Sequence, residues 1–228
     1  MDLHSGLPYW VIKNSLLDYF HPLKDDFSTD VVVIGAGITG ALMVHELCNA
    51  GLKCCVIDKR SIATGSSAAS TALLQYEIDV PLCRMAEMIG EDNAVTAYRA
   101  CLQSISDIEK VLESTGVEAG FERVPSLFYA STQKDVKLVK EEYEMRKKHH
   151  LPVSLLGKEE IKERYKLQVP GCGLLNEVSA QIDAYRAATG LLLYHIKKDG
   201  LEVFTHTGVK ECVEKHGGYV IDRKSTRL

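Results

Sequence analysis

The segment that most constrains the fold of this chain is a buried strand pattern that runs directly into a glycine-rich turn. Residues 30–34, DVVVI, form a continuous β-branched run that suits a strand covered on both faces of a parallel sheet. Residues 35–40, GAGITG, fit G-x-G-x-x-G, and residues 41–51 predict a helix that ends at a glycine. Residues 53–58, KCCVID, predict a second buried strand, which completes a βαβ unit.

Each glycine of this turn has its own physical task in binding a dinucleotide. Gly35 permits the tight turn, Gly37 lets the backbone approach a pyrophosphate, and Gly40 lets the helix pack closely on the strand. The amino end of the helix then offers unpaired N–H groups and positive partial charge to the phosphates. Asp58 follows roughly 20 residues later, where a carboxylate accepts hydrogen bonds from a ribose. An ordinary strand–helix turn is the alternative, but it leaves the coincidence of these features unexplained.

Length and composition describe an ordinary globular chain. The chain has 228 residues, of which 46% are hydrophobic and 25% charged, and its net charge is −4. The mild negative charge argues against nucleic acid as a partner. No apolar run reaches the length of about 18 residues that a membrane-spanning helix needs, and residues 1–20 do not resemble a signal peptide.

The cysteines predict a reducing environment. There are seven of them, an odd number, and no two stand in a C-x-x-C pair. This spacing favours neither a disulfide framework nor a structural zinc site. We therefore expect a cytoplasmic protein with free thiols and no metal.

Periodicity and turn signals predict the remaining elements. Helices are expected at 91–115, 132–149, 158–165 and 183–198. Strands are expected at 73–78, 124–130, 153–156, 202–207, 209–214 and 219–222. The aromatic residues and prolines before residue 30 predict an arm that packs on the folded body.

A second motif follows the second predicted strand. Residues 65–72, GSSAASTA, supply small side chains, hydroxyls and free N–H groups that can line a flat ring or a second phosphate. Together, VVVIGAGITGAL, VIDKR and GSSAASTALLQYEID resemble the D-amino-acid-oxidase-like superfamily of FAD-dependent oxidoreductases. That superfamily includes glycine and sarcosine oxidases and glycerol-3-phosphate dehydrogenases. The resemblance covers most of residues 30–222 and is specific at 30–82.

The resemblance implies an α/β protein with a FAD/NAD(P)-binding Rossmann-like three-layer fold and an interleaved α+β substrate domain, truncated at the C-terminus. It divides the chain into an N-terminal arm (1–29), a FAD-binding βαβ unit with its flavin segment (30–82), a portion of the substrate domain (83–182), a return to the FAD-binding domain (183–222) and a tail (223–228). For the tail, a read-through or cloning scar and a native terminus both stay open.

The resemblance also implies FAD as the cofactor and places its parts on numbered residues. The pyrophosphate lies on the turn Gly35, Ala36, Gly37, Ile38, Thr39 and Gly40. Asp58 binds the adenosine ribose, with Lys59 and Arg60 beside the adenosine portion. A segment of Gly65, Ser66, Ser67, Ser70, Thr71, Ala72 and Leu73 runs along the phosphates towards the isoalloxazine, and the backbone of Val209 touches adenine.

The implied activity is the oxidation of a C–H next to an amine or hydroxyl in a small-molecule substrate, by hydride transfer to flavin. No catalytic residue is assigned, although Gln75, Tyr76 and Glu77 are polar candidates for the substrate side. We expect the isolated chain to bind flavin weakly and to be inactive. Two other functions stay open: an NAD-dependent dehydrogenase, in which Asp58 repels a 2′-phosphate, and a non-catalytic dinucleotide-binding module. The oligomeric state is not indicated.

Overall fold

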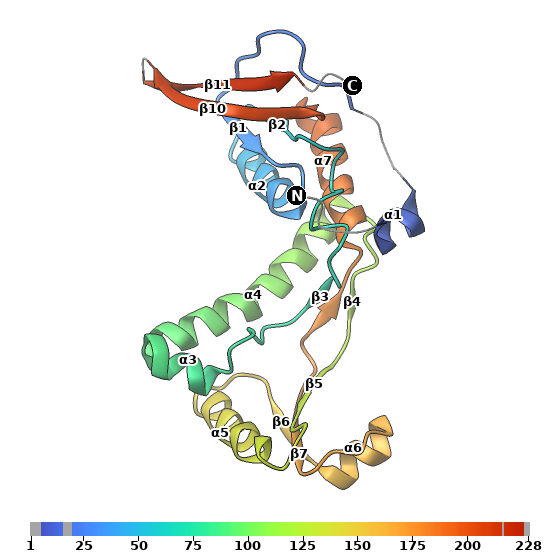
Figure 1. Cartoon of the computed structure of the whole chain (residues 1–228), viewed down its shortest axis with the longest axis vertical. Helices are drawn as coiled ribbons and strands as arrows, with labels where there is room; N and C mark the ends of the chain where they lie inside the picture. The colour runs from blue at the N-terminus through green and yellow to red at the C-terminus, as the bar shows by residue number, and fades with distance from the viewer. Residues whose placement is uncertain (1–5, 16–19, 216, 226–228) are drawn as a thin grey trace. The chain divides into compact units, whose positions relative to one another are not determined.

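The computed structural model describes residues 6–15, 20–215 and 217–225 (Figure 1). The chain forms two compact units. The first comprises residues 1–72, 112–120 and 183–228, and the second comprises 73–111 and 121–182. The first unit is therefore assembled from three separate stretches of the sequence.

A parallel sheet forms the centre of the first unit. Its strands are β1 (Val31–Ile34), β2 (Cys54–Ile57) and β9 (Glu202–Phe204), in the order β1-β2-β9 with both pairs parallel. All four residues of β2 are buried, as expected for the central strand of a covered parallel sheet. The two strands predicted around the glycine turn are confirmed.

Two helices of this unit, α2 (Ile38–Asn49) and α7 (Ala184–Asp199), pack against each other. The Asp183 carboxylate begins α7 by accepting a hydrogen bond from the Arg186 N–H at 3.0 Å, and Gly200 ends it in the left-handed conformation. A third helix, α1 (Tyr9–Asn14), belongs to the N-terminal arm and contacts α7. The arm thus packs on the body, although its residues 1–5 and 16–19 lie outside the described residues.

The first unit also carries an antiparallel hairpin, the long red pair in Figure 1, made of β10 (Thr207–Lys215) and β11 (Gly218–Ser225). Its second strand was predicted to end at Asp222 but continues three residues further. The extension has a physical cause, because the Arg223 guanidinium donates hydrogen bonds to the carbonyls of Leu23 and Lys24 in the arm. Residues 226–228 of the predicted tail lie outside the described part.

The second unit contains two small antiparallel sheets and four helices. One sheet has the order β3-β8-β4 and the other β5-β7-β6. The strands are β3 (Leu73–Leu74), β4 (Glu122–Arg123), β5 (Ser126–Tyr129), β6 (Ser154–Gly157), β7 (Cys172–Asn176) and β8 (Ala180–Gln181), and the helices are α3 (Leu82–Ile89), α4 (Glu91–Thr115, in this unit up to Val111), α5 (Asp135–Lys148) and α6 (Lys158–Tyr165).

Some predicted elements of the second unit are wrong in extent. The strand expected at 73–78 stops at Leu74, because Tyr76 turns into the core and donates its hydroxyl to the Pro152 carbonyl at 2.7 Å. The strand expected at 124–130 begins only at Ser126, after Pro125, which has no N–H to donate. The helix expected from Thr132 begins at Asp135, whose carboxylate accepts hydrogen bonds from the N–H and hydroxyl of Thr132.

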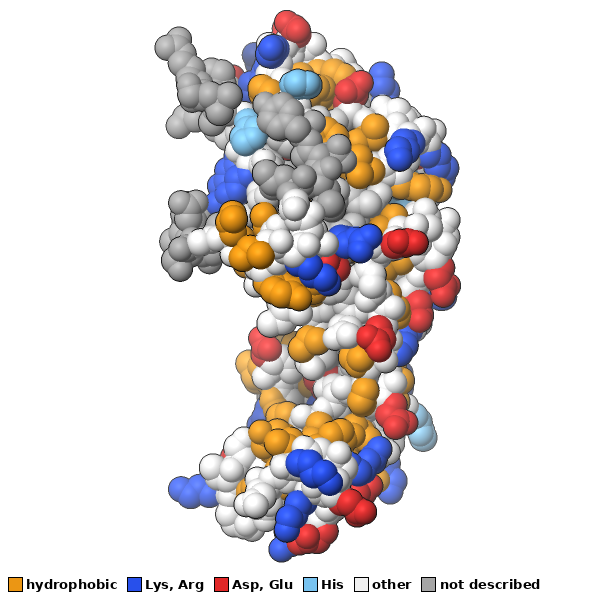
Figure 2. Space-filling model, turned by 90° about the vertical axis from the view of Figure 1, so that its right-hand side faces the viewer, with side chains coloured by type: hydrophobic (Ala, Val, Ile, Leu, Met, Phe, Trp, Pro, Cys, Tyr) orange, Lys and Arg blue, Asp and Glu red, His pale blue; other side chains and the backbone are white. Residues whose placement is uncertain are grey.

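The surface is mixed in charge. Figure 2 shows acidic and basic side chains intermingled on the face in view rather than gathered into a patch of one sign. Within the described ranges, no helix combines the length and apolar character that crossing a bilayer requires.

Candidate functional site

The glycine turn between β1 and α2 brings helix and strand into very close approach. Gly35 has a φ of +111°, a conformation that L side chains rarely adopt, and its N–H donates to the Ile57 carbonyl at 2.8 Å. A Cβ placed on Gly40 would lie 1.9 Å from the Gly35 carbonyl oxygen and 3.4 Å from Val33 Cγ1. Gly40 therefore has no room for a side chain, and this lack of space fixes where α2 begins.

The amino end of α2 is capped by a side chain from the second motif. Gly37 is the N-cap residue, and the Ile38 N–H donates to Ser67 Oγ at 2.9 Å. A Cβ on Gly37 would lie 3.0 Å from that same hydroxyl oxygen, so a glycine keeps the concave surface open. The first turn of α2 contains no acidic residue, so its positive end stays available to an anion.

Asp58 follows the end of β2, and its carboxylate connects the glycine turn to the loop after β2 through hydrogen bonds. Its Oδ2 accepts a hydrogen bond from the Ala36 N–H at 2.7 Å, and its Oδ1 accepts one from the Arg60 N–H at 2.8 Å. Each carboxylate oxygen has a second acceptor position that these bonds leave open. The half-buried Asp58 can therefore hold the backbone and still accept hydrogen bonds from a ribose.

The small-residue segment after β2 is a run of turns with one strained residue. Ser67 is buried, whereas Ser66, Ser70 and Thr71 are exposed. Ser70 Oγ accepts a hydrogen bond from the Ala72 N–H at 3.0 Å, and Ala72 has a φ of +57°. An alanine in this left-handed region is strained, and the surrounding contacts must hold it there.

Contacts join the start of β10 to the residues that follow β2. Lys59 is exposed beside Gly208, whose hypothetical Cβ would lie 3.7 Å from Lys59 Cβ, and Val209 follows at the start of β10. The Thr207 N–H donates to the Asp58 carbonyl at 2.8 Å, which joins this strand to the end of β2. Of the predicted residues, only Leu73 falls in the second unit, as the first residue of β3.

Sequence reasoning missed a hydrogen-bonded chain between α2 and α7 that has two buried histidines at its centre. Lys198 donates to Asn49 Oδ1 at 3.3 Å, which leaves the Asn49 amide to donate to His45 Nε2 at 2.9 Å. His45 Nδ1 then carries a proton and donates to His195 Nε2 at 3.0 Å, and His195 Nδ1 donates to Asp199 Oδ2 at 2.6 Å. Burial lowers the pKa of His45.

Cys48 lies beside this chain. Its sulfur and ligand atoms of His195 and Asp199 lie within 4.8 Å of one another, a grouping that could hold a metal ion. The two nitrogens of His195 already have hydrogen-bond partners, and burial raises the pKa of Cys48 to about 11. No local pattern in the sequence indicates this grouping, because its members come from two helices that are distant in the chain.

The second unit contains a buried ionic network around Arg146. Its guanidinium donates to Glu142 at 2.7 Å and to Glu77 at 2.9 Å, and the side chains of Arg146 and Glu142 are 2% and 0% exposed. Glu142 also accepts from the N–H groups of Leu82 and Cys83 at 2.9 Å each, which caps α3. This carboxylate thus positions α3 against α5.

Two of the three polar candidates for the substrate side, Tyr76 and Glu77, meet at the Arg146 guanidinium, and Gln75 lies apart from them. Tyr76 is fully buried and burial raises its pKa to about 12, so it remains a protonated donor. Glu77 joins the Arg146 network, although its Oε2 is buried without a hydrogen-bond partner. Gln75 is exposed and donates to Ser126 Oγ at 3.3 Å. All three residues follow the end of β3 at Leu74 and so lie outside the strand.

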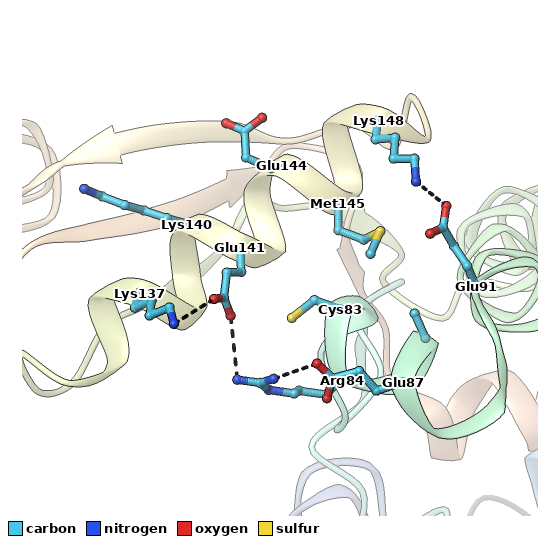
Figure 3. A pocket seen from close by; sticks show the side chains of 11 residues that line it. Cys83, Arg84, Glu87, Glu91, Lys137, Lys140, Glu141, Glu144, Met145 and Lys148 are labelled. Atoms are coloured by element: carbon cyan, nitrogen blue, oxygen red, sulfur yellow. Dashed lines mark hydrogen bonds and ion pairs between the residues drawn. The ribbon is translucent and has the colours of Figure 1, made fainter.

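A groove of about 800 Å³ lies between α3 and α5 in the second unit (Figure 3). Its charged side chains are balanced, with four basic and four acidic residues, and ion pairs join Lys137 to Glu141, Glu141 to Arg84 and Arg84 to Glu87. Cys83 and Met145 add an apolar part to the lining. Nothing in this lining resembles a nucleotide-binding motif.

The fold and the geometry of the glycine turn define a protein that binds a dinucleotide at the carboxyl ends of parallel strands. Residues 30–227 match the model of the FAD dependent oxidoreductases, known as DAO. The chain belongs to this family, whose cofactor is FAD.

Individual relatives agree in fold while differing in chemistry. The "Probable oxidoreductase OrdL" of Haemophilus influenzae is 24% identical over 87% of this chain and 46% of its own length. L-Amino acid deaminase from Proteus myxofaciens is 16% identical with a TM-score of 0.73, over 93% of this chain and 46% of that chain. L-α-Glycerophosphate oxidase from Mycoplasma pneumoniae, solved with FAD bound, is 18% identical with a TM-score of 0.65, over 87% of this chain and 50% of that chain. The chain thus spans about half the length of these proteins.

The residues present fit FAD. A Cβ would fill the surface at Gly37, and the first turn of α2 contains no acidic residue, so its amino end offers positive partial charge to a pyrophosphate. The Asp58 carboxylate has acceptor positions left for a ribose. These features would hold the adenosine diphosphate half of the cofactor.

Proposed function

We propose that the complete protein oxidises a small molecule at a C–H bond next to an amine or a hydroxyl. FAD, when bound, takes up the two electrons as a hydride equivalent, and the substrate loses a proton from nitrogen or oxygen to give an imine or a carbonyl compound. The family match and the glycine turn support the redox class. The names of the deaminase and the glycerophosphate oxidase suggest the two substrate classes.

In this proposal the first unit binds the cofactor and the second contributes part of the substrate domain. Residues Gly35–Gly40 hold the pyrophosphate, Asp58 holds the adenosine ribose, and Lys59 and Arg60 lie beside the adenosine. The segment from Gly65 to Ala72, continued by Leu73, runs along the phosphates towards the flavin ring, and the Val209 backbone contacts adenine. The close approach of Gly40 to Gly35 is the observation that carries the assignment, because the third glycine of a dinucleotide-binding turn is the one that lets the helix pack closely on the strand.

The test uses the full-length protein. We expect it to purify with a flavin spectrum, and we expect anaerobic addition of an amino acid, an amine or a hydroxy acid to bleach that spectrum. Binding of NADH without any response to FAD would select an NAD-dependent dehydrogenase instead. A flavin that no compound of these classes reduces would favour a non-catalytic dinucleotide-binding module.

We further propose that the 228-residue chain alone is inactive and that the protein is cytoplasmic. The chain spans about half the length of its relatives, which supports the first point. Seven free cysteines, most of them at least half-buried, support the second. Stoichiometric flavin and turnover in the isolated chain would contradict the former, and recovery of the protein outside the cytoplasm would contradict the latter.

A further inference from the structure

We propose that Trp10, in the N-terminal arm, is a positioning residue for the cofactor. Its indole N–H donates a hydrogen bond to the backbone carbonyl of Ser70 at 2.8 Å, across 60 positions of sequence. Ser70 belongs to the segment that the proposed function places along the phosphates and the flavin, and the inference rests on that function. Trp10 would therefore act on the cofactor through the backbone of Ser70.

Ser70 is held from two sides at the point where the segment is strained. The indole bonds its carbonyl, while its hydroxyl accepts the Ala72 N–H at 3.0 Å. Ala72 is 4% exposed and has a φ of +57°. A left-handed alanine persists only where neighbouring contacts over-determine the backbone. The indole hydrogen bond is one of those contacts, and its loss would let residues 70–72 relax.

The indole belongs to α1, a helix that needs contacts with the rest of the first unit to be stable. Helix α1 has only six residues, far fewer than an isolated helix needs in water. It is anchored by Asn14, whose amide donates to Asp183 Oδ2 at 2.7 Å and to the Trp10 carbonyl at 3.0 Å. Lys13 adds an ion pair of 3.7 Å to the same carboxylate, and its ammonium lies 4.9 Å from the centre of the indole ring.

Asp183 connects α1 to α7, one of the two packed helices of the first unit. Its side chain is 4% exposed, and its other oxygen caps α7 at the Arg186 N–H. Because α7 packs on α2, α1 is connected through Asp183 to the helix whose amino end is the proposed pyrophosphate site. The arm therefore joins the flavin segment to the phosphate-binding helix.

The later part of the arm reaches the adenosine end of the same site. The carbonyls of Phe20 and His21 accept hydrogen bonds from the hydroxyl and the N–H of Thr205. The Leu23 N–H donates to Thr207 Oγ1 at 3.0 Å, and the Thr207 N–H donates to the Asp58 carbonyl. The described parts of the arm thus contact both ends of the proposed cofactor site, which a mere N-terminal extension would not need to do.

The test compares two single substitutions on α1 in the full-length protein loaded with FAD. Trp10→Phe removes the N–H donor and keeps an aromatic ring, whereas Ile12→Ala shortens a side chain that is 67% exposed on the same helix. Loss of one such hydrogen bond predicts a two- to tenfold weaker FAD affinity in Trp10→Phe and a changed visible circular dichroism of the bound flavin. Ile12→Ala should change neither. Wild-type values for both readouts in Trp10→Phe would overturn the proposal.

A second measurement does not need the flavin and separates positioning from general loss of stability. Hydrogen exchange of the apoprotein should become faster at the Ala72 amide in Trp10→Phe and stay unchanged in the strands of the parallel sheet. Faster exchange throughout the first unit, or none at Ala72, would overturn the positioning role. A full-length wild-type protein that binds no FAD would instead overturn the proposed function, and that result is visible before any variant is made.

Discussion

Gly40 lies so close to Gly35 that the carbonyl oxygen of one residue occupies the space where a Cβ of the other would be. The separation would be 1.9 Å, well inside contact distance, and the nearest obstacle is backbone that cannot rotate away. The start of α2 therefore depends on the absence of a single methyl group. That same helix end is the proposed pyrophosphate site.

Gly40→Ala should separate α2 from β1. We expect a loss of about 1–3 kcal/mol in the free energy of unfolding, as for overpacking in a core, together with loss of retained flavin. Thermal unfolding and the ratio of flavin to protein absorbance in the purified full-length protein check this. Gly157→Ala is the matched control, because nothing lies within 4 Å of a Cβ there and its φ is −77°. Equal behaviour of the two variants would contradict the prediction.

Asp58→Asn should weaken FAD binding by at least tenfold. An asparagine has one acceptor oxygen, so either the Ala36 or the Arg60 N–H would face its amide group instead of a carboxylate oxygen. The substitution also removes acceptor positions open to the ribose, and a hydroxyl left without its acceptor in the complex costs about 1–3 kcal/mol. Fluorescence titration of the apoprotein with FAD measures the effect, and Asp26→Asn, an exposed aspartate of the arm, serves as the control. Unchanged affinity in Asp58→Asn would remove Asp58 from the site.

The stability of the first unit should fall as the pH drops below about 6.5. Burial lowers the pKa of His45 from its usual 6.5, with His195 and Lys198 adding to this effect and Glu46 and Asp199 opposing it. Between the lowered folded value and 6.5, the unfolded chain binds more protons than the folded chain, so stability rises with pH across that window. Urea unfolding of the wild type and of His45→Gln from about pH 5.5 to 7.5 tests this, since the variant should show the smaller slope. Identical slopes would argue that His45 does not titrate in this range.

Arg146→Met should strongly destabilise the second unit. It would leave the carboxylates of Glu142 and Glu77 buried without their cation, which costs about 3–5 kcal/mol. Urea unfolding measures the change, and adding Glu142→Gln and Glu77→Gln should restore part of it. The control is Lys137→Met on the same helix, whose ion pair with Glu141 is exposed and whose loss should leave unfolding nearly unchanged. A small effect of Arg146→Met would mean that water or a proton already compensates the network.

The sequence could predict features that local patterns encode. The strands on either side of the glycine turn follow from β-branched runs, and the long helix 91–115 follows from apolar spacing, with both of its ends correct. Helix α3 was not predicted, because its amino end is capped by Glu142, a residue that is distant in the chain. The strand expected at 73–78 is short because Tyr76 and Glu77 have partners in the core that no window of sequence contains.

The same limit applies to the candidate site. The glycines and Asp58 stand in a pattern with a known spacing, so they could be selected by sequence alone. Trp10 could not, because its contact with Ser70 depends on how a short helix docks on Asp183. The histidine chain of α2 and α7 is likewise formed only when two distant helices meet.

The pairing of β2 with β9 has a consequence for how the protein is made. The central strand of the first unit finds one of its two partners only after all of the intervening second unit has been translated. On the ribosome, β1, α2 and β2 must therefore remain an incomplete sheet, in which the backbone N–H and C=O groups at one edge of β2 are unpaired, while the second unit can already fold. We expect the second unit to become protease-resistant first during synthesis, and incorporation of FAD to be a late event that depends on the arrival of residues 202–204.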